Sequence, residues 1–308
     1  MYDVVIIGGG PAGLSAAIYS IRFNLKTLVF AAEIGGLIAK SHLVENWPGI
    51  KAISGYDLGV QLEDHYKSFN GELKYEQVKE IKKIDGGFKL TADGGEIETK
   101  TVIIATGSDV RKLGIPGEKE FYSKGVSYCA TCDAAFFKEK TLAIIGGSDS
   151  AATEALLLAK YAKKVYIIYR KDKLRAEPIN RQRVEKHEKI ELIYNTNITE
   201  VKANEEGKKV GSVVLDKEYN NSNELPLDGI FIAIGHIPNN YLPIELGVEL
   251  AKNGRVNVDS GCRTNVKGIF AAGDITNQDY DQAITAAADG VKAAFSANEH
   301  LGHESFNY

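Results

Sequence analysis

A strand, a glycine turn, a helix and a second strand follow one another at two places in the chain, and this repeated pattern limits the fold more than any other feature. The first copy has a β-rich run from Tyr2 to Ile7, the turn GGGPAG from Gly8 to Gly13, an alanine-rich stretch to about Asn24 and an apolar run from Leu25 to Phe30. A glycine turn between a strand and a helix brings backbone amide groups close to a pyrophosphate. We therefore expect a dinucleotide to bind at this turn.

The second copy begins near residue 141. Thr141 to Ile145 predicts a strand, Gly146 to Ala151 the turn, Ala152 to Tyr161 a helix and Val165 to Tyr169 a second strand. Two dinucleotide sites in one chain indicate that electrons pass from one cofactor to another. The alternative is a duplicated fold in which one site is inactive.

Each copy continues with a meander of short strands and closes with an apolar strand that ends in glycine, Val102 to Gly107 in the first and Ile230 to Gly235 in the second. The sequence then returns to the first unit with a strand from Gly268 to Ala272, the pair Gly273-Asp274 and a helix that opens near Gln282. The pattern predicts an α/β fold of two Rossmann-like, three-layer ββα domains, with the second domain inserted into the first.

Composition excludes several classes of protein. With 308 residues the chain has room for about two domains. A net charge of −4 gives no general attraction to nucleic acid or to an anionic membrane. No apolar stretch reaches the ~18 residues of a membrane span, the start from Val4 to Ile7 lacks the basic flank of a signal peptide, and three cysteines cannot form a disulfide framework. We expect a soluble, cytoplasmic protein without a nucleic-acid or membrane partner.

The pair Cys129 and Cys132 concentrates the chemistry. Cysteines three residues apart at the start of a helix lie on one face, within the ~4.4–6.8 Å Cα separation of a disulfide, and the helix start favours the thiolate of the first one. Zinc is the competing use of the motif, but it needs two more ligands. Only Cys262 remains, and His300 and His303 are the only closely spaced histidines, so we expect no metal and interpret Cys262 as a packing residue. Asp133 either exchanges a proton with the thiols or with a reduced flavin, or caps the helix.

Charged residues suggest which dinucleotide binds at each turn. The basic run from Arg170 to Arg175 follows the second strand of the second copy, where an acidic residue would favour NADH. Cations there favour the 2′-phosphate of NADPH, and a solvated charged face is the alternative. In the first copy Glu33 is either a ribose ligand or a solvated loop carboxylate. Asp274, at the end of a strand, is expected to help to seat FAD.

Together these features resemble the low-molecular-weight thioredoxin reductases over essentially the whole chain. The resemblance rests on the opening turn and on six further motifs: Gly35-Gly36, Val44 to Gly49, Ala105 to Gly107, Cys129 to Asp133, Arg170 to Arg175 and Gly268 to Asp274. It implies an oxidoreductase that is a homodimeric flavoprotein, an NADPH-dependent thioredoxin-disulfide reductase. It also implies an FAD-binding domain of residues 1–111 plus 241–308 and an NAD(P)H-binding domain of residues 112–240 that carries the redox-active disulfide.

The resemblance also implies the site residues. Those for FAD are Gly8, Gly10, Pro11, Ala12, Gly13, Glu33, Gly35, Gly36, Leu37, Asn46, Ala105, Thr106, Gly107, Gly273, Asp274, Gln282 and Ala283. Those for NADPH are Gly146, Gly147, Ser148, Asp149, Ser150, Ala151, Arg170, Lys171 and Arg175. By the same resemblance, Cys132 faces the flavin, Cys129 attacks the disulfide of thioredoxin or of a thioredoxin- or glutaredoxin-like protein, and Asp133 is the acid.

One disulfide must meet both a flavin and a protein substrate, so we expect the inserted domain to rotate about the crossings Arg111 to Pro116 and His236 to Asn240. The sequence departs from the family pattern at Ser148, at Tyr169 and at Asp281, which is an added carboxylate near the flavin. Alternatives are a related flavin disulfide reductase with another electron donor or dithiol acceptor, and a non-catalytic flavin redox sensor.

Overall fold

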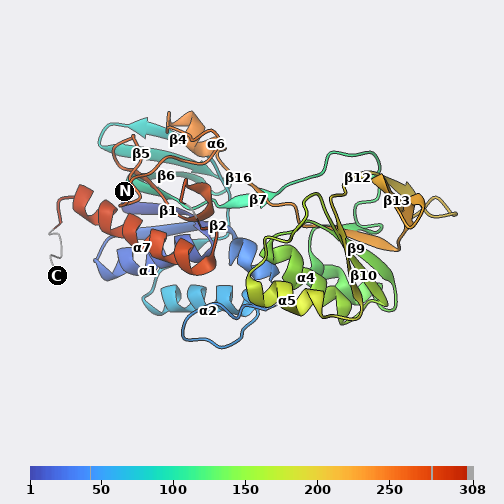
Figure 1. The fold of residues 1–308 in the computed structure, drawn as a ribbon. Coiled ribbons are helices and arrows are strands. Elements are labelled where there is room, and N and C mark those ends of the chain that lie inside the picture. The colour runs from blue at the N-terminus through green and yellow to red at the C-terminus, as the bar shows by residue number, and fades with distance from the viewer. Residues whose placement is uncertain (42, 279, 304–308) are drawn as a thin grey trace. The chain divides into compact units, whose positions relative to one another are not determined.

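The computed structural model describes residues 1–41, 43–278 and 280–303 (Figure 1). The chain forms two compact units: unit 1 consists of Met1–Asp109 and Ile237–Tyr308, and unit 2 of Val110–His236. Within the described residues, none of the helices combines the length and the apolar character that are needed to span a lipid bilayer.

A seven-stranded sheet forms the centre of unit 1, in the order β3-β2-β1-β6-β5-β4, with β17 also paired to β6. Its strands are β1 (Tyr2–Gly9), β2 (Thr27–Ile34), β3 (Glu72–Lys74), β4 (Val78–Ile84), β5 (Gly87–Ala92), β6 (Gly95–Ile104) and β17 (Ile269–Ala271). The second half of β6 pairs parallel with β1 and β17, whereas its first half pairs antiparallel with β5. One long strand therefore joins the parallel sheet to the β4-β5 hairpin.

Alternate residues of β1 face two different cores. Val4 and Ile6 pack with the helices, whereas Val5 and Ile7 pack with Phe88 of the hairpin. Because successive side chains of a strand point to opposite faces, the buried central residues of β1 contact a helical layer on one side and a strand layer on the other. The helical segments of unit 1 are α1 (Pro11–Arg22), η1 (Gly36–Lys40), α2 (Gly55–Ser68), α6 (Tyr241–Glu245), η3 (Gly273–Ile275) and α7 (Ala283–His300).

Unit 2 repeats this layering around a five-stranded parallel sheet of the order β11-β10-β9-β15-β8. The strands are β8 (Val126–Ser127), β9 (Thr141–Ile145), β10 (Lys164–Tyr169), β11 (Ile190–Tyr194) and β15 (Gly229–Ile232). Leu142 and Ile144 of β9 pack with the helices, and Ala143 and Ile145 pack with a three-stranded antiparallel sheet. The other elements are α3 (Ala130–Asp133), η2 (Ala134–Phe137), α4 (Asp149–Ala159), α5 (Pro178–Glu185), β12 (Ile198–Ala203), β13 (Val210–Tyr219) and β14 (Ser222–Pro226). The predicted α/β class with two Rossmann-like, three-layer domains is confirmed.

Several predicted element boundaries differ from those in the structure, and two of these differences have a clear physical cause. Strand β2 was expected to end at Phe30 but continues to Ile34, because the pairing register shifts and Ile34 becomes the partner of Gly9. Helix α4 was expected to begin at Ala152 but begins at Asp149, because Ser148 is extended and its side chain caps the helix.

The chain leaves unit 1 and returns to it through two segments that pair with each other. Strand β7 (Ser108–Val110) on the way out pairs with β16 (His236–Pro238) on the way back. Beyond the two ends of this ladder, the Arg111 N–H donates to the Gly235 oxygen at 2.8 Å, and the Asn239 N–H donates to the Gly107 oxygen at 3.0 Å.

Candidate active site

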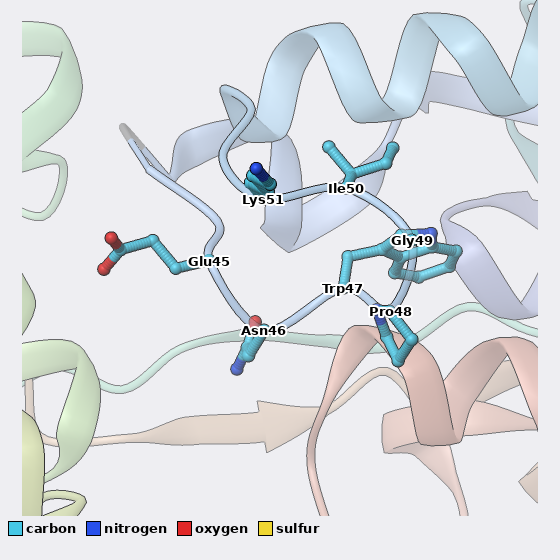
Figure 2. Close-up of a pocket in the computed structure, with 7 residues that line it drawn as sticks. All are labelled: Glu45, Asn46, Trp47, Pro48, Gly49, Ile50 and Lys51. Atoms are coloured by element: carbon cyan, nitrogen blue, oxygen red, sulfur yellow. The ribbon is translucent and has the colours of Figure 1, made fainter.

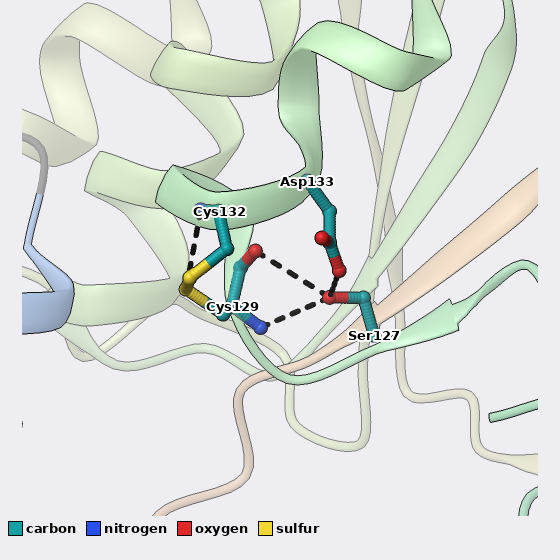
Figure 3. Close-up of a disulfide and its surroundings, with 4 residues drawn as sticks. All are labelled: Ser127, Cys129, Cys132 and Asp133. Atoms are coloured by element: carbon teal, nitrogen blue, oxygen red, sulfur yellow. Dashed lines mark hydrogen bonds between the residues drawn. A yellow bond between two sulfur atoms is a disulfide. The ribbon is translucent and has the colours of Figure 1, made fainter. Parts of the chain in front are cut away.

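Cys129 and Cys132 form a disulfide in unit 2, with their Cα atoms 5.3 Å apart (Figure 3). Cys129 is the N-cap residue of α3, and its Sγ accepts a hydrogen bond from the Cys132 N–H at 3.2 Å. Cys132 is exposed and Cys129 is half-buried. An amide N–H that points at sulfur stabilises a thiolate more than a thiol. This hydrogen bond therefore favours the thiolate of Cys129 after reduction, and the role of Cys129 as the attacking sulfur stays a prediction.

The hydroxyl of Ser127 connects the dithiol with Asp133 (Figure 3). Ser127 is the last residue of β8 and is 4% exposed; its Oγ donates to Asp133 Oδ2 at 2.6 Å and accepts from the Cys129 N–H at 3.0 Å. Asp133 is half-buried and lies in the first turn of α3, and among the described residues its side chain makes no capping bond at the start of η2. Both roles that the sequence leaves open for Asp133, proton exchange and helix capping, stay predictions. The sequence analysis missed Ser127, although a small hydroxyl residue two positions before the first cysteine was a usable signal.

In the first glycine turn a side chain would clash with the backbone at Gly8, whereas Gly10 has space around it. Gly8 has a φ of +131°, and a Cβ there would lie 2.0 Å from the Ala105 oxygen. A Cβ at Gly10 would meet only the Gly35 oxygen, at 3.8 Å. Gly10 is also the N-cap of α1, and it has no side chain to occupy the first amide groups of the helix. This uncovered helix start fits the pyrophosphate of FAD.

Further residues predicted for FAD lie around the same helix start. The Gly35 N–H donates to the Gly9 oxygen at 2.8 Å, and the following η1 carries Gly36 and Leu37. Gly273 packs against Ala12 of α1, since a Cβ at Gly273 would lie 2.9 Å from the Ala12 Cβ. The turn, η1 and η3 therefore meet at one place, although they come from distant parts of the sequence.

Two of the residues predicted to bind FAD make other contacts in the structure. Glu33 lies within the last residues of β2 and is exposed, with its backbone oxygen beside Gly9. The Thr106 hydroxyl donates to the Asn239 oxygen at 2.9 Å, so this side chain holds the returning chain. Their roles as FAD ligands stay predictions.

Asn46 and Gln282 link a loop to the start of α7. Asn46 Nδ2 donates to Gln282 Oε1 at 3.0 Å, and Gln282 is the N-cap of α7 in a capping box with Thr285. Figure 2 shows the loop of Asn46, which lines an open pocket with Glu45, Trp47, Pro48, Gly49, Ile50 and Lys51. The contact fixes one side of this loop against the helix start.

Asp274 in η3 carries a perturbed carboxyl group. Its pKa is raised to about 6, mainly by burial; the negative charge of Asp281 adds to the rise, and the positive charge of Arg255 opposes it. Asp281 itself forms a bidentate ion pair with Arg255, with both N···O distances at 2.6 Å. The added carboxylate that the sequence analysis noted is therefore paired.

In unit 2 the second turn carries more side chains than the first. The Ser148 Oγ accepts from the Ala151 N–H at 3.4 Å at the start of α4. The Asp149 carboxylate accepts from the Glu177 N–H at 2.8 Å and from Asn180 Nδ2 at 3.0 Å, which ties α4 to the start of α5. Contact of Asp149 with NADPH stays a prediction.

The basic run lies beside this turn. The Arg175 N–H donates to the Gly147 oxygen at 2.7 Å, and the side chains of Arg170, Lys171 and Arg175 are exposed. Tyr169, directly before the run, is buried, and a Cβ at Gly147 would lie 2.5 Å from its ring. Exposed cations next to a helix start fit the 2′-phosphate and pyrophosphate of NADPH.

Glu118 is a second polar residue that the sequence analysis missed. Its carboxylate is 4% exposed and accepts from the Leu113 N–H at 2.8 Å, from the Gly114 N–H at 2.6 Å and from the Tyr128 hydroxyl at 2.7 Å. Burial alone would raise its pKa, but these hydrogen bonds keep the pKa below its usual value. Glu118 thus ties the segment that enters unit 2 to the residue before Cys129.

The third cysteine stands apart from this chemistry. Cys262 is fully buried in unit 1, and burial raises the pKa of its thiol to about 12. Within the part of the chain that the structure describes, no group of three or more His, Cys, Asp or Glu side chains could hold a metal ion.

Residues 2–290 match the pyridine nucleotide-disulphide oxidoreductase family. A thioredoxin reductase of Bacillus subtilis (strain 168) is 42% identical over 305 residues, which make up 98% of this chain and 95% of that protein. Among solved structures, a Lactococcus lactis thioredoxin reductase matches with a TM-score of 0.94 at 40% identity, covering 98% of this chain and 99% of that one. A T. acidophilum thioredoxin reductase matches with a TM-score of 0.92 at 37% identity, covering 97% and 98%. The predicted resemblance is confirmed: the chain belongs to the pyridine nucleotide-disulphide oxidoreductase family and, within it, to the low-molecular-weight thioredoxin reductases.

Proposed function

We propose that the protein is an NADPH-dependent thioredoxin-disulfide reductase, in which unit 1 binds FAD and unit 2 binds NADPH. The observation that carries the proposal is the Cys129–Cys132 disulfide, which begins a helix in the same unit as the second nucleotide turn. Bound FAD supplies the two-electron carrier between the nicotinamide and the disulfide. The acceptor is thioredoxin or a protein of the thioredoxin or glutaredoxin type.

The side chains of unit 2 carry out the exchange half of the reaction. After two electrons and two protons have opened the disulfide into two thiols, the Cys129 thiol gives its proton to Asp133, and the resulting thiolate attacks a sulfur of the acceptor disulfide to form a mixed disulfide. Asp133 then returns this proton to the displaced acceptor thiolate. Finally the Cys132 thiol loses its proton and attacks the Cys129 sulfur; the second acceptor thiolate takes up that proton, so the intramolecular disulfide is restored and the acceptor leaves as a dithiol.

Unit 2 rotates relative to unit 1 during turnover, because a single rigid arrangement cannot offer one disulfide both to a flavin and to a protein substrate. Residues 113–118 are anchored within unit 2 by Glu118 and by the bond from the Val201 N–H to the Pro116 oxygen, at 3.0 Å. This anchoring favours a hinge closer to β7 and β16 than to Pro116. Unimpaired turnover after the two units have been cross-linked would refute the rotation.

Two further parts of the proposal concern the state of the protein in the cell. It forms a homodimer, which sedimentation equilibrium of the FAD-bound protein tests directly, and a monomer at micromolar concentration contradicts this part. It works in the cytoplasm, which cell fractionation tests.

The deciding experiment is an anaerobic titration of the FAD-bound protein with NADPH and, separately, with NADH. Bleaching of the flavin by NADPH at lower concentration than by NADH is expected, followed by sustained NADPH oxidation when oxidised thioredoxin is added. Cys129→Ser and Cys132→Ser should stop thioredoxin reduction, whereas Cys262→Ala, the matched control, should not.

Each alternative gives a different result. A protein that takes up no FAD contradicts the whole proposal. Flavin bleaching by neither nucleotide points to another electron donor. Bleaching by NADPH without sustained turnover on thioredoxin points to a redox sensor or to another dithiol acceptor.

A further inference from the structure

Three charged side chains surround the start of α7 in unit 1. Arg255 Nη1 and Nη2 each lie 2.6 Å from one carboxylate oxygen of Asp281. Arg255 Nη1 also donates to the Thr276 oxygen at 3.4 Å. The side chain of Arg255 is 20% exposed and that of Asp281 is 48% exposed, so solvent screens this pair only in part. Bidentate geometry fixes both side chains more firmly than a single contact would.

The ion pair lies next to residues that the proposed function assigns to FAD. Asp281 directly precedes Gln282, the N-cap of α7, and the backbone oxygen of Asp281 accepts from Gln282 Nε2 at 2.9 Å. Gln282 in turn accepts from Asn46 at 3.0 Å. Asp274 interacts electrostatically with both Arg255 and Asp281. The pair therefore belongs to the same cluster as the loop of Asn46 and the start of α7.

The net charge of this cluster determines how strongly it stabilises the reduced form of a bound flavin. The start of a helix is electropositive and favours negative charge nearby, which is the state of a reduced flavin. Two uncompensated carboxylates, Asp274 and Asp281, would oppose that effect. Arg255 cancels one of the two charges.

We propose that Arg255 is a positioning residue for the flavin: by neutralising Asp281 and holding it against the start of α7, it preserves the electropositive helix end that stabilises reduced FAD. The inference rests on the proposed function, because it takes FAD to bind beside Gln282 and Asp274. The inference predicts that the reduction potential of bound FAD shifts in opposite directions when Arg255 or Asp281 is replaced by a neutral residue.

The test measures the midpoint potential of bound FAD in three variants by anaerobic reductive titration against a reference dye. Arg255→Met leaves Asp281 uncompensated and should weaken binding of reduced relative to oxidised FAD by about five- to tenfold, which is a shift of about 20 to 30 mV to more negative potential for a two-electron couple. Asp281→Asn leaves Arg255 uncompensated and should shift the potential by a similar amount in the positive direction. The double variant keeps the net charge of the pair and should return close to the parent value.

Thermal unfolding separates this role from a purely structural one. Both single variants break the same ion pair, so both should lower the unfolding temperature of the FAD-bound protein, while their potentials move in opposite directions. Arg263→Met is the matched control, because Arg263 pairs with Glu299 in the same unit and away from these residues; it should leave the potential unchanged.

Three results would overturn the inference. Potentials that shift in the same direction in both single variants would make the pair a structural contact only. The inference would also be overturned if neither single variant shifted the potential of bound FAD, or if Arg263→Met shifted this potential as much as Arg255→Met does. A parent protein that binds no FAD is a different failure, because it would refute the proposed function itself.

Discussion

Removal of the Ser127 hydroxyl isolates its contribution to the dithiol. In Ser127→Ala the Asp133 carboxylate loses its 2.6 Å hydrogen bond, and the Cys129 N–H loses its 3.0 Å acceptor. Hydrogen bonds to charged groups contribute about 1.5–3 kcal/mol, and because Asp133 is half-buried we expect a loss near the lower end, about 1.5–2 kcal/mol of unfolding free energy. Without this contact the Asp133 side chain can turn away, and its protonated carboxyl group is then less often in position to deliver the proton; we therefore expect the exchange rate with thioredoxin to fall about tenfold.

The matched control is Ser212→Ala. Ser212 is also buried in unit 2, and its hydroxyl donates to Glu224 at 2.6 Å, far along the chain from the dithiol. Both variants should lose similar stability in urea, but only Ser127→Ala should slow the reaction of the pre-reduced enzyme with oxidised thioredoxin in stopped flow.

A double variant tests the reasoning behind this prediction. Asp133→Asn should slow exchange by roughly 100-fold, the low end of the range for a general acid. Addition of Ser127→Ala should then have little further effect, because the two residues act as a unit. An unchanged exchange rate in Ser127→Ala, or a full additional tenfold loss in the Asp133→Asn background, would refute the view that Ser127 acts through Asp133.

Three further predictions concern other parts of the chain. Glu118→Gln should lower the unfolding free energy by about 2 kcal/mol at pH 7. Because the pKa of Glu118 is lowered in the folded protein, this loss should be complete above about pH 4.5 and should shrink as the pH falls below that value. Urea titrations at pH 7 and at pH 4 would measure it. In FAD-free protein, Asp274→Asn should raise the unfolding free energy by roughly 2–3 kcal/mol at pH 8 but not at pH 4. The reason is that the pKa of Asp274 is raised to about 6 in the folded protein, so ionisation of this carboxyl group destabilises the folded state. Equal effects at both pH values would contradict this prediction. Arg175→Ala should raise the KM for NADPH about tenfold and leave that for NADH nearly unchanged in steady-state assays, whereas equal effects on both would contradict a 2′-phosphate contact.

The parts of the fold that the sequence predicts well depend on short, contiguous patterns. The turn from Gly8 to Gly13 and its second copy can be recognised because the spacing of small residues is set by backbone contacts within one strand-turn-helix unit. The spacing of Cys129 and Cys132 likewise fixes their separation through local helix geometry.

The polar contacts that complete the site could not be predicted in the same way. Asp281 pairs with Arg255 across 26 positions, and Asn46 pairs with Gln282 across 236 positions. Neither partner belongs to a periodic pattern, so only the packed fold brings them together. The end of β2 at Ile34 is a similar case, because pairing with β1, not local propensity, determines where that strand stops.

The two segments that join unit 1 and unit 2 pair with each other, and this limits the effect of the insertion on the fold of unit 1. The Gly107 oxygen and the Asn239 N–H are one hydrogen bond apart, at 3.0 Å, although more than a third of the protein lies between them in sequence. The host Rossmann fold is therefore interrupted at a single spot, and its own strands keep the neighbours that they would have in an unbroken chain. An insertion with adjoining ends disturbs neither layer of its host. Such a junction lets a complete second nucleotide module be gained, exchanged or lost without any rearrangement of the first.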